Sequence, residues 1–236
     1  MRAPLWILYL DLAQFFPRIS RVIRCESDLL IGLPPEVVNL TRHIYGAEAA
    51  KHRGAEEELA SQPPVQCQYD TGAGLGRPFA QPHGSLMGCV FSPSQAKQLL
   101  RSVAAAIACV ARGVRMWGGE AEAVVRQVLF GDDWCGLSGS AGEVKRMWEI
   151  WAAWEPIVGA KIGIKEWLKT VLTAVEWDAE GRPRSPAPIS LETVAGIEVP
   201  VVPCNVAYPH LGGLRRADGN DRVAWVGQHV GKAKAK

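Results

Sequence analysis

The sequence lacks several features that would assign it to a class of protein at first sight. Its six cysteines include no Cys-x-x-Cys pair, which excludes zinc-finger and thioredoxin types of site. No apolar run is long enough to span a bilayer, and a net charge of +2 is too small to indicate a nucleic-acid-binding protein by itself. What remains is a chain of 236 residues, 48% of them hydrophobic, which is long enough to bury a core of its own.

The N-terminus superficially looks like a secretion signal. However, its apolar run of residues 4–10 meets Asp11 at once, and no small-residue cleavage site follows. The cysteines are scattered along the chain, at Cys25, Cys67, Cys89, Cys109, Cys135 and Cys204. We therefore expect an intracellular protein that is not secreted, with reduced and mostly buried thiols and no membrane partner.

The pattern of apolar residues predicts a mixture of helices and strands. Strands are expected at residues 5–12 and 196–202, and strand–turn–strand pairs over residues 65–81 and 124–139. Helices are expected at residues 32–46, 91–113 and 142–157, while the polar residues 47–64 form either a solvated helix or an inserted loop. Helices mixed with hairpins are typical of the α+β class, which is the fold class that we predict.

Two of these helices carry an apolar face. In the helix at 91–113, Ser92 is the expected cap and Pro93 the first helical residue. Its apolar face consists of Ala96, Leu99, Leu100, Val103, Ile107 and Val110. The helix at 142–157 has a stripe of Val144, Trp148, Trp151 and Trp154. We interpret both faces as parts of the core.

A short turn carries two adjacent carboxylates, Asp132 and Asp133, after Gly131 and inside an otherwise apolar run. Like charges side by side cost stability unless a cation offsets them. Asp11, at the end of the first expected strand, would supply a third carboxylate, and such oxygen donors suit Mg²⁺. The alternative is a plain surface turn with two solvated aspartates. The dipeptide alone favours that alternative, but its apolar flanks favour a buried site.

Five segments follow one another in an order that is more specific than any of them alone. "LYLDLAQFFPRIS" ends a strand in an aspartate with an aromatic residue five positions on, and "HGSLMGCVFSPSQAKQLL" joins a glycine loop to a helix. "LFGDDW", "VGAKIGIKEWLKT" and "YPHLGGL" come next. Together they resemble the five motifs of a reverse transcriptase palm, of the type found in non-LTR retrotransposons and group II introns.

The resemblance spans residues 5–214 and implies both a fold and a reaction. The fold would be a polymerase palm over residues 1–214, an antiparallel sheet with helices packed on one face. Partial fingers would lie at about residues 20–80, and a tail or the start of a missing thumb at residues 215–236. The reaction would be template-directed DNA synthesis from RNA. Its partners would be an RNA template, a DNA or RNA primer and deoxynucleoside triphosphates, in the nucleus or the cytoplasm.

The resemblance also implies catalytic roles. Asp11 and Asp132 would bridge two Mg²⁺ ions, for which Mn²⁺ could substitute, with Asp133 close by. Lys169 would approach the leaving pyrophosphate as a proton donor, and Lys165 is an open alternative to it.

Further residues would hold the nucleotide, the template and the primer. Leu12 would offer a backbone group near the triphosphate, and Phe16 would exclude a ribose 2′-hydroxyl, unless Phe15 has that role and Phe16 belongs to the core. Met87 and Gly88 would line the nucleotide pocket. Template and primer would contact Gly84, Ser92, Pro93, His210, Leu211 and Gly212. Arg77, in an expected hairpin, is interpreted as a surface residue.

The chain departs from the family pattern in three places. Met87 stands where a glutamine is usual, and Phe15 stands where a small residue is usual. Only ten residues precede Asp11, so we expect the upstream fingers and the thumb to belong to a parent polyprotein. One alternative is a non-catalytic or decayed palm that binds RNA as a maturase does. An RNA-dependent RNA polymerase is a weaker alternative, because Phe16 stands where such enzymes keep a second aspartate.

Overall fold

The computed structural model describes residues 3–45, 65–68, 72, 74–81, 84, 92–118, 121–164, 169–210 and 213–219. The chain divides into two compact units. One, the sheet unit, consists of Met1–Leu12, Ala104–Ala152 and Ile162–Lys236. The other, the helical unit, consists of Ala13–Val103 and Ala153–Lys161. The helical unit contains the region at about 20–80 that was expected to form partial fingers, and it extends beyond that region on both sides.

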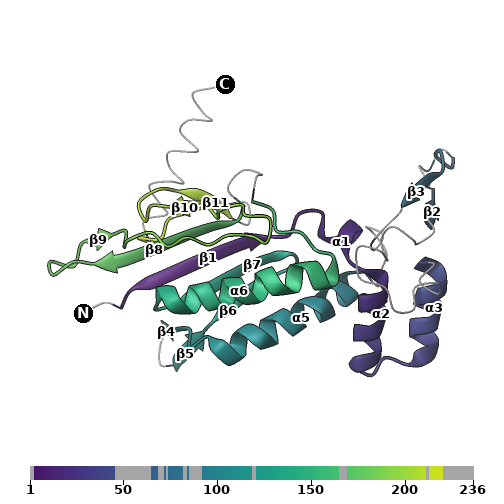
Figure 1. Ribbon diagram of the computed structural model, residues 1–236, viewed down its shortest axis with the longest axis horizontal. Coiled ribbons are helices and arrows are strands. Elements are labelled where there is room, and N and C mark those ends of the chain that lie inside the picture. Colours follow the sequence, from purple (N-terminus) through teal and green to yellow (C-terminus); the bar gives the residue numbers. More distant parts are fainter. Residues whose placement is uncertain are drawn as a thin grey trace. The chain divides into compact units, whose positions relative to one another are not determined.

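The sheet unit is built around one central strand, β1 (Leu5–Asp11). The strand order is β10–β8–β1–β7–β6, and β9 pairs with β8 (Figure 1). These strands are β6 (Gln127–Phe130), β7 (Asp133–Ser138), β8 (Val171–Trp177), β9 (Pro183–Arg184) and β10 (Val201–Val202). All of the pairs are antiparallel except β10 with β8, which is parallel. The α+β class with an antiparallel sheet is therefore confirmed.

Both faces of the sheet are covered, which explains why β1 is a continuous apolar run and does not alternate. On one face Trp134 packs against Trp151 of α6 (Ala141–Val158), with ring centroids 5.4 Å apart. On the other face Tyr9 packs against Tyr208, with ring centroids 4.7 Å apart. Figure 1 shows α6 along one face, and the segment that contains β11 (Tyr208–His210) covers the other.

The core of the second face joins residues from distant parts of the sequence. It consists of Ile7, Tyr9, Cys135, Val171, Val175, Val202, Cys204, Tyr208 and Ala217. The expectation of helices on one face thus describes only one of the two faces of the sheet. The C-terminal segment covers the other face.

Two of the expected strand regions were drawn wrongly. Residues 124–139 contain parts of two hairpins: β4 (Val114–Gly118) pairs with β5 (Ala121–Val125), and β6 pairs with β7. The chain leaves the first hairpin at Arg126, which lies outside both strands. Of the expected strand at 196–202, only Val201–Val202 pairs with the main sheet, because the preceding residues fold back in an isolated bridge between Glu192 and Glu198.

The helical unit begins with α1 (Phe15–Arg18), α2 (Arg21–Leu30) and α3 (Pro35–Tyr45). The helix at 32–46 is confirmed as α3, while α2 was not expected. Ser20 caps α2 by accepting a hydrogen bond from the amide of Ile23, with a length of 3.2 Å. The unit also contains the hairpin of β2 (Val65–Cys67) and β3 (Phe79–Gln81).

The helix expected at 91–113 is α5 (Ser92–Val110), whose residues 104–110 belong to the sheet unit. Its predicted apolar face is buried apart from Val110, which is 37% exposed because it lies at the last turn. All four residues of the stripe predicted on α6 are buried.

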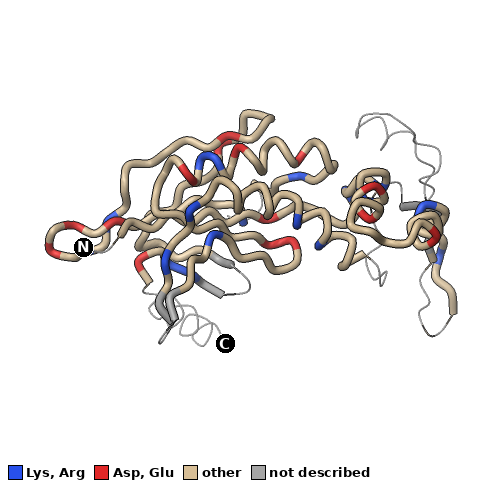
Figure 2. The backbone as a smooth tube through the Cα atoms, turned by 90° about the horizontal axis from the view of Figure 1, so that it is seen from below, with Lys and Arg blue, Asp and Glu red and all other residues tan. Residues whose placement is uncertain are grey.

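The distribution of charged residues and of apolar helices in the structure agrees with the small net charge and the short apolar runs of the sequence. Figure 2 shows Lys and Arg interspersed with Asp and Glu along the described backbone. None of the helices in the described ranges has both the length and the apolar composition that a membrane crossing requires. Residues 47–64 and 220–236 lie outside the described ranges.

Candidate active site

Three aspartates lie at one end of the two central strands. Asp11 is the last residue of β1, and its direct partner across the antiparallel ladder is Asp133, the first residue of β7. Residues directly opposite one another in such a ladder have Cβ atoms about 5 Å apart. Asp132 precedes them in the turn, where Gly131 takes the left-handed conformation, with φ 63°, that a tight hairpin needs. The predicted hairpin therefore brings all three carboxylates to one end of β1 and β7.

The three carboxylates repel one another. The pKa of the Asp133 carboxyl is raised, first by its partial burial and then by the charges of Asp132 and Asp11, while Lys169 acts in the opposite direction. Asp11 is buried, at 8% exposure, whereas Asp132 and Asp133 are half-buried. The result is an excess of negative charge at a partly buried site, which favours the binding of a cation.

Lys169 and Thr170, which directly precede β8, both contact Asp11. The Lys169 ammonium lies 3.2 Å and 3.4 Å from the two carboxylate oxygens of Asp11. The amide of Asp11 donates a hydrogen bond of 3.1 Å to the hydroxyl of Thr170, which is fully buried. Lys169 thus belongs to the site, as predicted, and the alternative Lys165 lies outside the described residues.

Sequence reasoning missed Thr170, and its position shows why. The ladder between β1 and β8 ends at the pair of Tyr9 with Val171, so the peptide of Asp11 has no partner strand residue on that side. The side chain of Thr170 accepts the hydrogen bond that a longer strand would have accepted. A hydroxyl residue between a lysine and an apolar run is the only sequence signal, and it is a weak one.

The donor set suits a magnesium ion by its chemistry, although it is not a finished ligand set. In the described ranges, no group of three or more His, Cys, Asp or Glu side chains is arranged so that it could hold a metal ion. Instead, Lys169 occupies both oxygens of Asp11. The charge that raises the pKa of Asp133 is nevertheless of the kind that a hard cation offsets, and carboxylate oxygens are the ligands that Mg²⁺ prefers.

Leu12 follows Asp11 and is buried in the sheet unit. It forms an isolated antiparallel bridge with Ile162. In this bridge the amide of Gly163 donates a hydrogen bond of 2.8 Å to the carbonyl of Asp11. The predicted contact of the Leu12 backbone with a triphosphate stays a prediction.

In the helical unit, the two phenylalanines of α1 differ in burial. Phe15 is 2% exposed and belongs to the core, whereas Phe16 is half-buried, with the two ring centroids 5.8 Å apart. Of the two, Phe16 is the one that could meet a ligand. The sugar-excluding role of Phe16 stays a prediction.

Gly84 lies in the helical unit with φ 67°, and a Cβ atom there would overlap the backbone carbonyls of Phe16 and Pro17. This contact requires a glycine whether or not a template is present. Ser92, the first residue of α5, is buried, and Pro93 beside it is exposed. Their predicted contacts with template or primer stay predictions.

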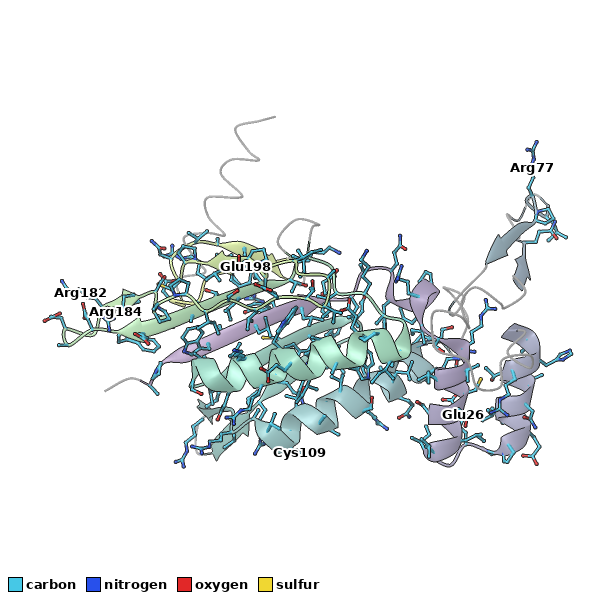
Figure 3. All side chains as sticks on the ribbon, viewed as in Figure 1. Glu26, Arg77, Cys109, Arg182, Arg184 and Glu198 are labelled. Carbon is cyan, nitrogen blue, oxygen red and sulfur yellow. The ribbon has the colours of Figure 1, made fainter. Side chains whose placement is uncertain are left out.

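The remaining predicted residues are only partly described. The backbone of His210 pairs with Gly213 in the small sheet of β11 and β12 (Gly213–Arg215), in keeping with a short turn. Leu211, Gly212, Met87 and Gly88 lie outside the described residues. Arg77 extends from the region of the β2–β3 hairpin and is exposed, as the surface interpretation predicts (Figure 3).

Comparison of the sequence with models of protein families gives no match, and neither does a search of curated proteins. The function of the candidate site has to be inferred from its own residues.

Proposed function

We propose that this chain carries the palm of an RNA-directed DNA polymerase and transfers deoxynucleotides by two-metal catalysis. The observation that carries the proposal is the meeting of Asp11, Asp132, Asp133 and Lys169 at one end of β1 and β7. An antiparallel sheet with a carboxylate on the central strand and two more on the adjoining hairpin is the arrangement that the resemblance to the reverse transcriptase palm implies. The order of the five motifs supports it further.

Each residue of the site has a role in this proposal. Asp11, Asp132 and Asp133 would hold two Mg²⁺ ions, which when bound would activate the primer 3′-hydroxyl and offset the charge of the leaving pyrophosphate. Thr170 holds the backbone of Asp11 and so orients its carboxylate. Lys169, whose ammonium lies 3.2 Å from Asp11, would turn from that carboxylate to the pyrophosphate and donate a proton to it.

The rest of the proposed reaction concerns substrate selection. Phe16 would pack against the sugar of the incoming nucleotide and collide with a 2′-hydroxyl, so that deoxynucleotides are preferred. Its half-exposed ring beside the buried Phe15 supports this role. The RNA template and the primer would supply the second substrate.

The test is incorporation of labelled dTTP on poly(rA)/oligo(dT) with Mg²⁺ or Mn²⁺. The wild-type chain is compared with the double variant Asp132→Asn, Asp133→Asn, which keeps the shape of both side chains but not their charge. Incorporation by the wild type that the double variant abolishes would support the proposal. If neither protein incorporates dTTP, the chain by itself is not a polymerase. Incorporation of UTP in preference to dTTP would instead indicate an RNA-dependent RNA polymerase.

A second function is favoured by one observation, the ion pair between Lys169 and Asp11. In a palm that no longer catalyses, a lysine could replace the cation permanently, and the domain would serve to bind RNA. Binding of Mn²⁺, followed by electron paramagnetic resonance, separates the two functions. A polymerase palm binds Mn²⁺ through the aspartates, whereas a palm closed by Lys169 binds RNA without it.

A further inference from the structure

One buried cation of the helical unit has no part in the site described so far. Arg21, the first residue of α2, is 0% exposed. Its Nε–H donates a hydrogen bond of 3.0 Å to the carbonyl oxygen of Gly84, 63 residues further along the chain. A buried guanidinium costs several kcal/mol to desolvate, so its N–H groups need acceptors, and the carbonyl of Gly84 is one of them.

The peptide that Arg21 holds is the one that lies against the sugar-excluding segment. A Cβ atom at Gly84 would overlap the backbone carbonyl oxygens of both Phe16 and Pro17. Gly84 therefore lies against the backbone of Phe16, and its carbonyl accepts a hydrogen bond from Arg21. The three residues form one connected cluster, which links the first motif of the sequence to the second.

The base of the cluster is fixed. Ser20, next to Arg21, caps α2 through its side chain and donates its own amide to the carbonyl of Val158 over 2.8 Å. Phe15, next to Phe16, is buried in the core. The half-exposed ring of Phe16 thus stands on a backbone that is held from both ends, and Arg21 holds the Gly84 peptide that lies against this backbone.

We propose that Arg21 is a positioning residue for substrate selection: it holds the Gly84 peptide against Phe16 and so sets how closely the Phe16 ring approaches the sugar of a nucleoside triphosphate. This inference rests on the proposed function. Lysine cannot replace arginine here, because the bond is donated by the rigid, side-on Nε–H of the guanidinium.

The first test needs no activity. In a ¹H–¹⁵N spectrum of the intact chain, the Nε–H of Arg21 gives a slowly exchanging signal because it is buried and hydrogen-bonded. Arg21→Lys identifies the signal by removing it. Gly84→Ala is expected to shift the signal or speed its exchange, because the added methyl group forces the peptide away from Phe16. An unchanged signal in Gly84→Ala would overturn the inference.

The second test compares substrates. Wild type, Arg21→Lys and Arg21→Met are assayed for binding and incorporation of dTTP and UTP. We expect the preference for dTTP to fall about tenfold in both variants, the loss that one charge-assisted hydrogen bond explains, with the change in KM larger than that in kcat. Arg24→Lys is the matched control, because Arg24 is also buried, one turn further along α2. It should cost similar stability in urea but leave the preference unchanged.

The outcomes are distinct. A wild-type chain that neither binds nor incorporates dTTP would overturn the proposed function, and this inference with it. A wild-type chain that prefers dTTP by the same factor as both Arg21 variants would overturn the inference alone. An equal loss of preference in Arg24→Lys would also overturn it, because the effect would then follow from stability.

Discussion

The amide of Asp11 bonds to Thr170, its carbonyl to Gly163 and its carboxylate to Lys169. The contact of Thr170 with the backbone can therefore be tested separately from the contact with the carboxylate. Thr170→Val keeps the shape of the side chain but leaves the amide of Asp11 without its 3.1 Å partner in a buried place. The expected cost is about 1–3 kcal/mol of stability. We expect incorporation of dTTP to fall about tenfold to a hundredfold, because a misplaced ligand weakens metal binding.

Thr170→Ser is the matched variant, because it keeps the hydroxyl and loses only a methyl group. It should restore most of the activity and of the Mn²⁺ affinity that Thr170→Val loses. If serine and valine behave alike in incorporation, in Mn²⁺ titration and in urea unfolding, then Thr170 fills space and does not position Asp11.

Asp133 provides a test of charge at the same site. Its pKa is raised, by burial first and then by Asp132 and Asp11, above the value of about 3.9 for a free aspartate. A carboxyl with a raised pKa favours the folded state most below its unfolded pKa, and the folded state loses stability as the pH rises through the raised value. Asp133→Asn removes that loss. The variant should melt at a higher temperature than the wild type at pH 7, and the difference should vanish near pH 3.

The same variant should lose incorporation by about a hundredfold or more, because a neutral amide cannot hold a cation in the transition state.

Asp178→Asn is a control for the melting temperature, with an expected effect of the opposite sign. The pKa of Asp178 is lowered, chiefly by the hydrogen bond from the backbone amide of Arg182, so its loss should lower the melting temperature at pH 7. A lower melting temperature for Asp133→Asn at pH 7 would mean that its repulsion is already offset.

At the scale of helices, α2 and α5 are joined through a polar contact. Gln95 of α5 donates a hydrogen bond of 2.8 Å to Asp28 of α2, and both side chains are buried. Gln95→Ala leaves the Asp28 carboxylate without this donor, which should cost about 1–3 kcal/mol in urea unfolding. Gln98→Ala, on the same helix, removes only an exposed contact with Arg101 and should cost less than about 0.5 kcal/mol. Equal costs for the two variants would contradict the importance of the Asp28 contact.

The contact between α2 and α5 also explains which elements could be predicted from the sequence. β1, α5 and α6 were predicted because each buries a run or a stripe of apolar residues, whereas α3 was predicted from the prolines at its start, Glu36 in its first turn and Gly46 after its end. α2 was missed because its buried face consists of Arg21, Arg24, Cys25 and Asp28, which show no apolar period. The helix exists because these groups pair with distant residues such as Gly84 and Gln95, and no local pattern reveals such partners.

The candidate site divides in the same way. The three aspartates and Lys169 were predicted from a dipeptide, a strand end and a resemblance, and the structure brings them together. Thr170 was not predicted, because its role depends on where the ladder between β1 and β8 ends. The β4–β5 hairpin was merged with the next one, because the two hairpins adjoin at the single residue Arg126.

At the scale of the whole molecule, thiol labelling can follow the two units separately. Cys25 is buried in the helical unit, and Cys135 and Cys204 are buried in the sheet unit. Burial raises the pKa of Cys135 to about 12, so this thiol is inert until it is exposed. Cys109 is exposed on α5 (Figure 3) and should react at once in the native protein.

Pulse labelling of variants that each keep one cysteine should show Cys25 reacting at a lower urea concentration than Cys135 or Cys204. The reason is that α2 buries Arg21, Arg24 and Asp28, and the desolvation of these charges offsets part of the apolar burial in the helical unit. Reaction of all three buried thiols over one urea range would mean that the two units unfold as one.

The positions of the partners of Asp11 in the sequence have a consequence for the synthesis of the protein. Asp133, Lys169 and Thr170 all come more than a hundred residues after Asp11, and the bond to Thr170 spans 159 residues. Asp11 is synthesised before all three of these partners, and the set is complete only once Thr170, directly before β8, has been added. The candidate site therefore depends on long-range contacts, and a chain released before Lys169 lacks both the ion pair and the backbone hydrogen bond that hold Asp11.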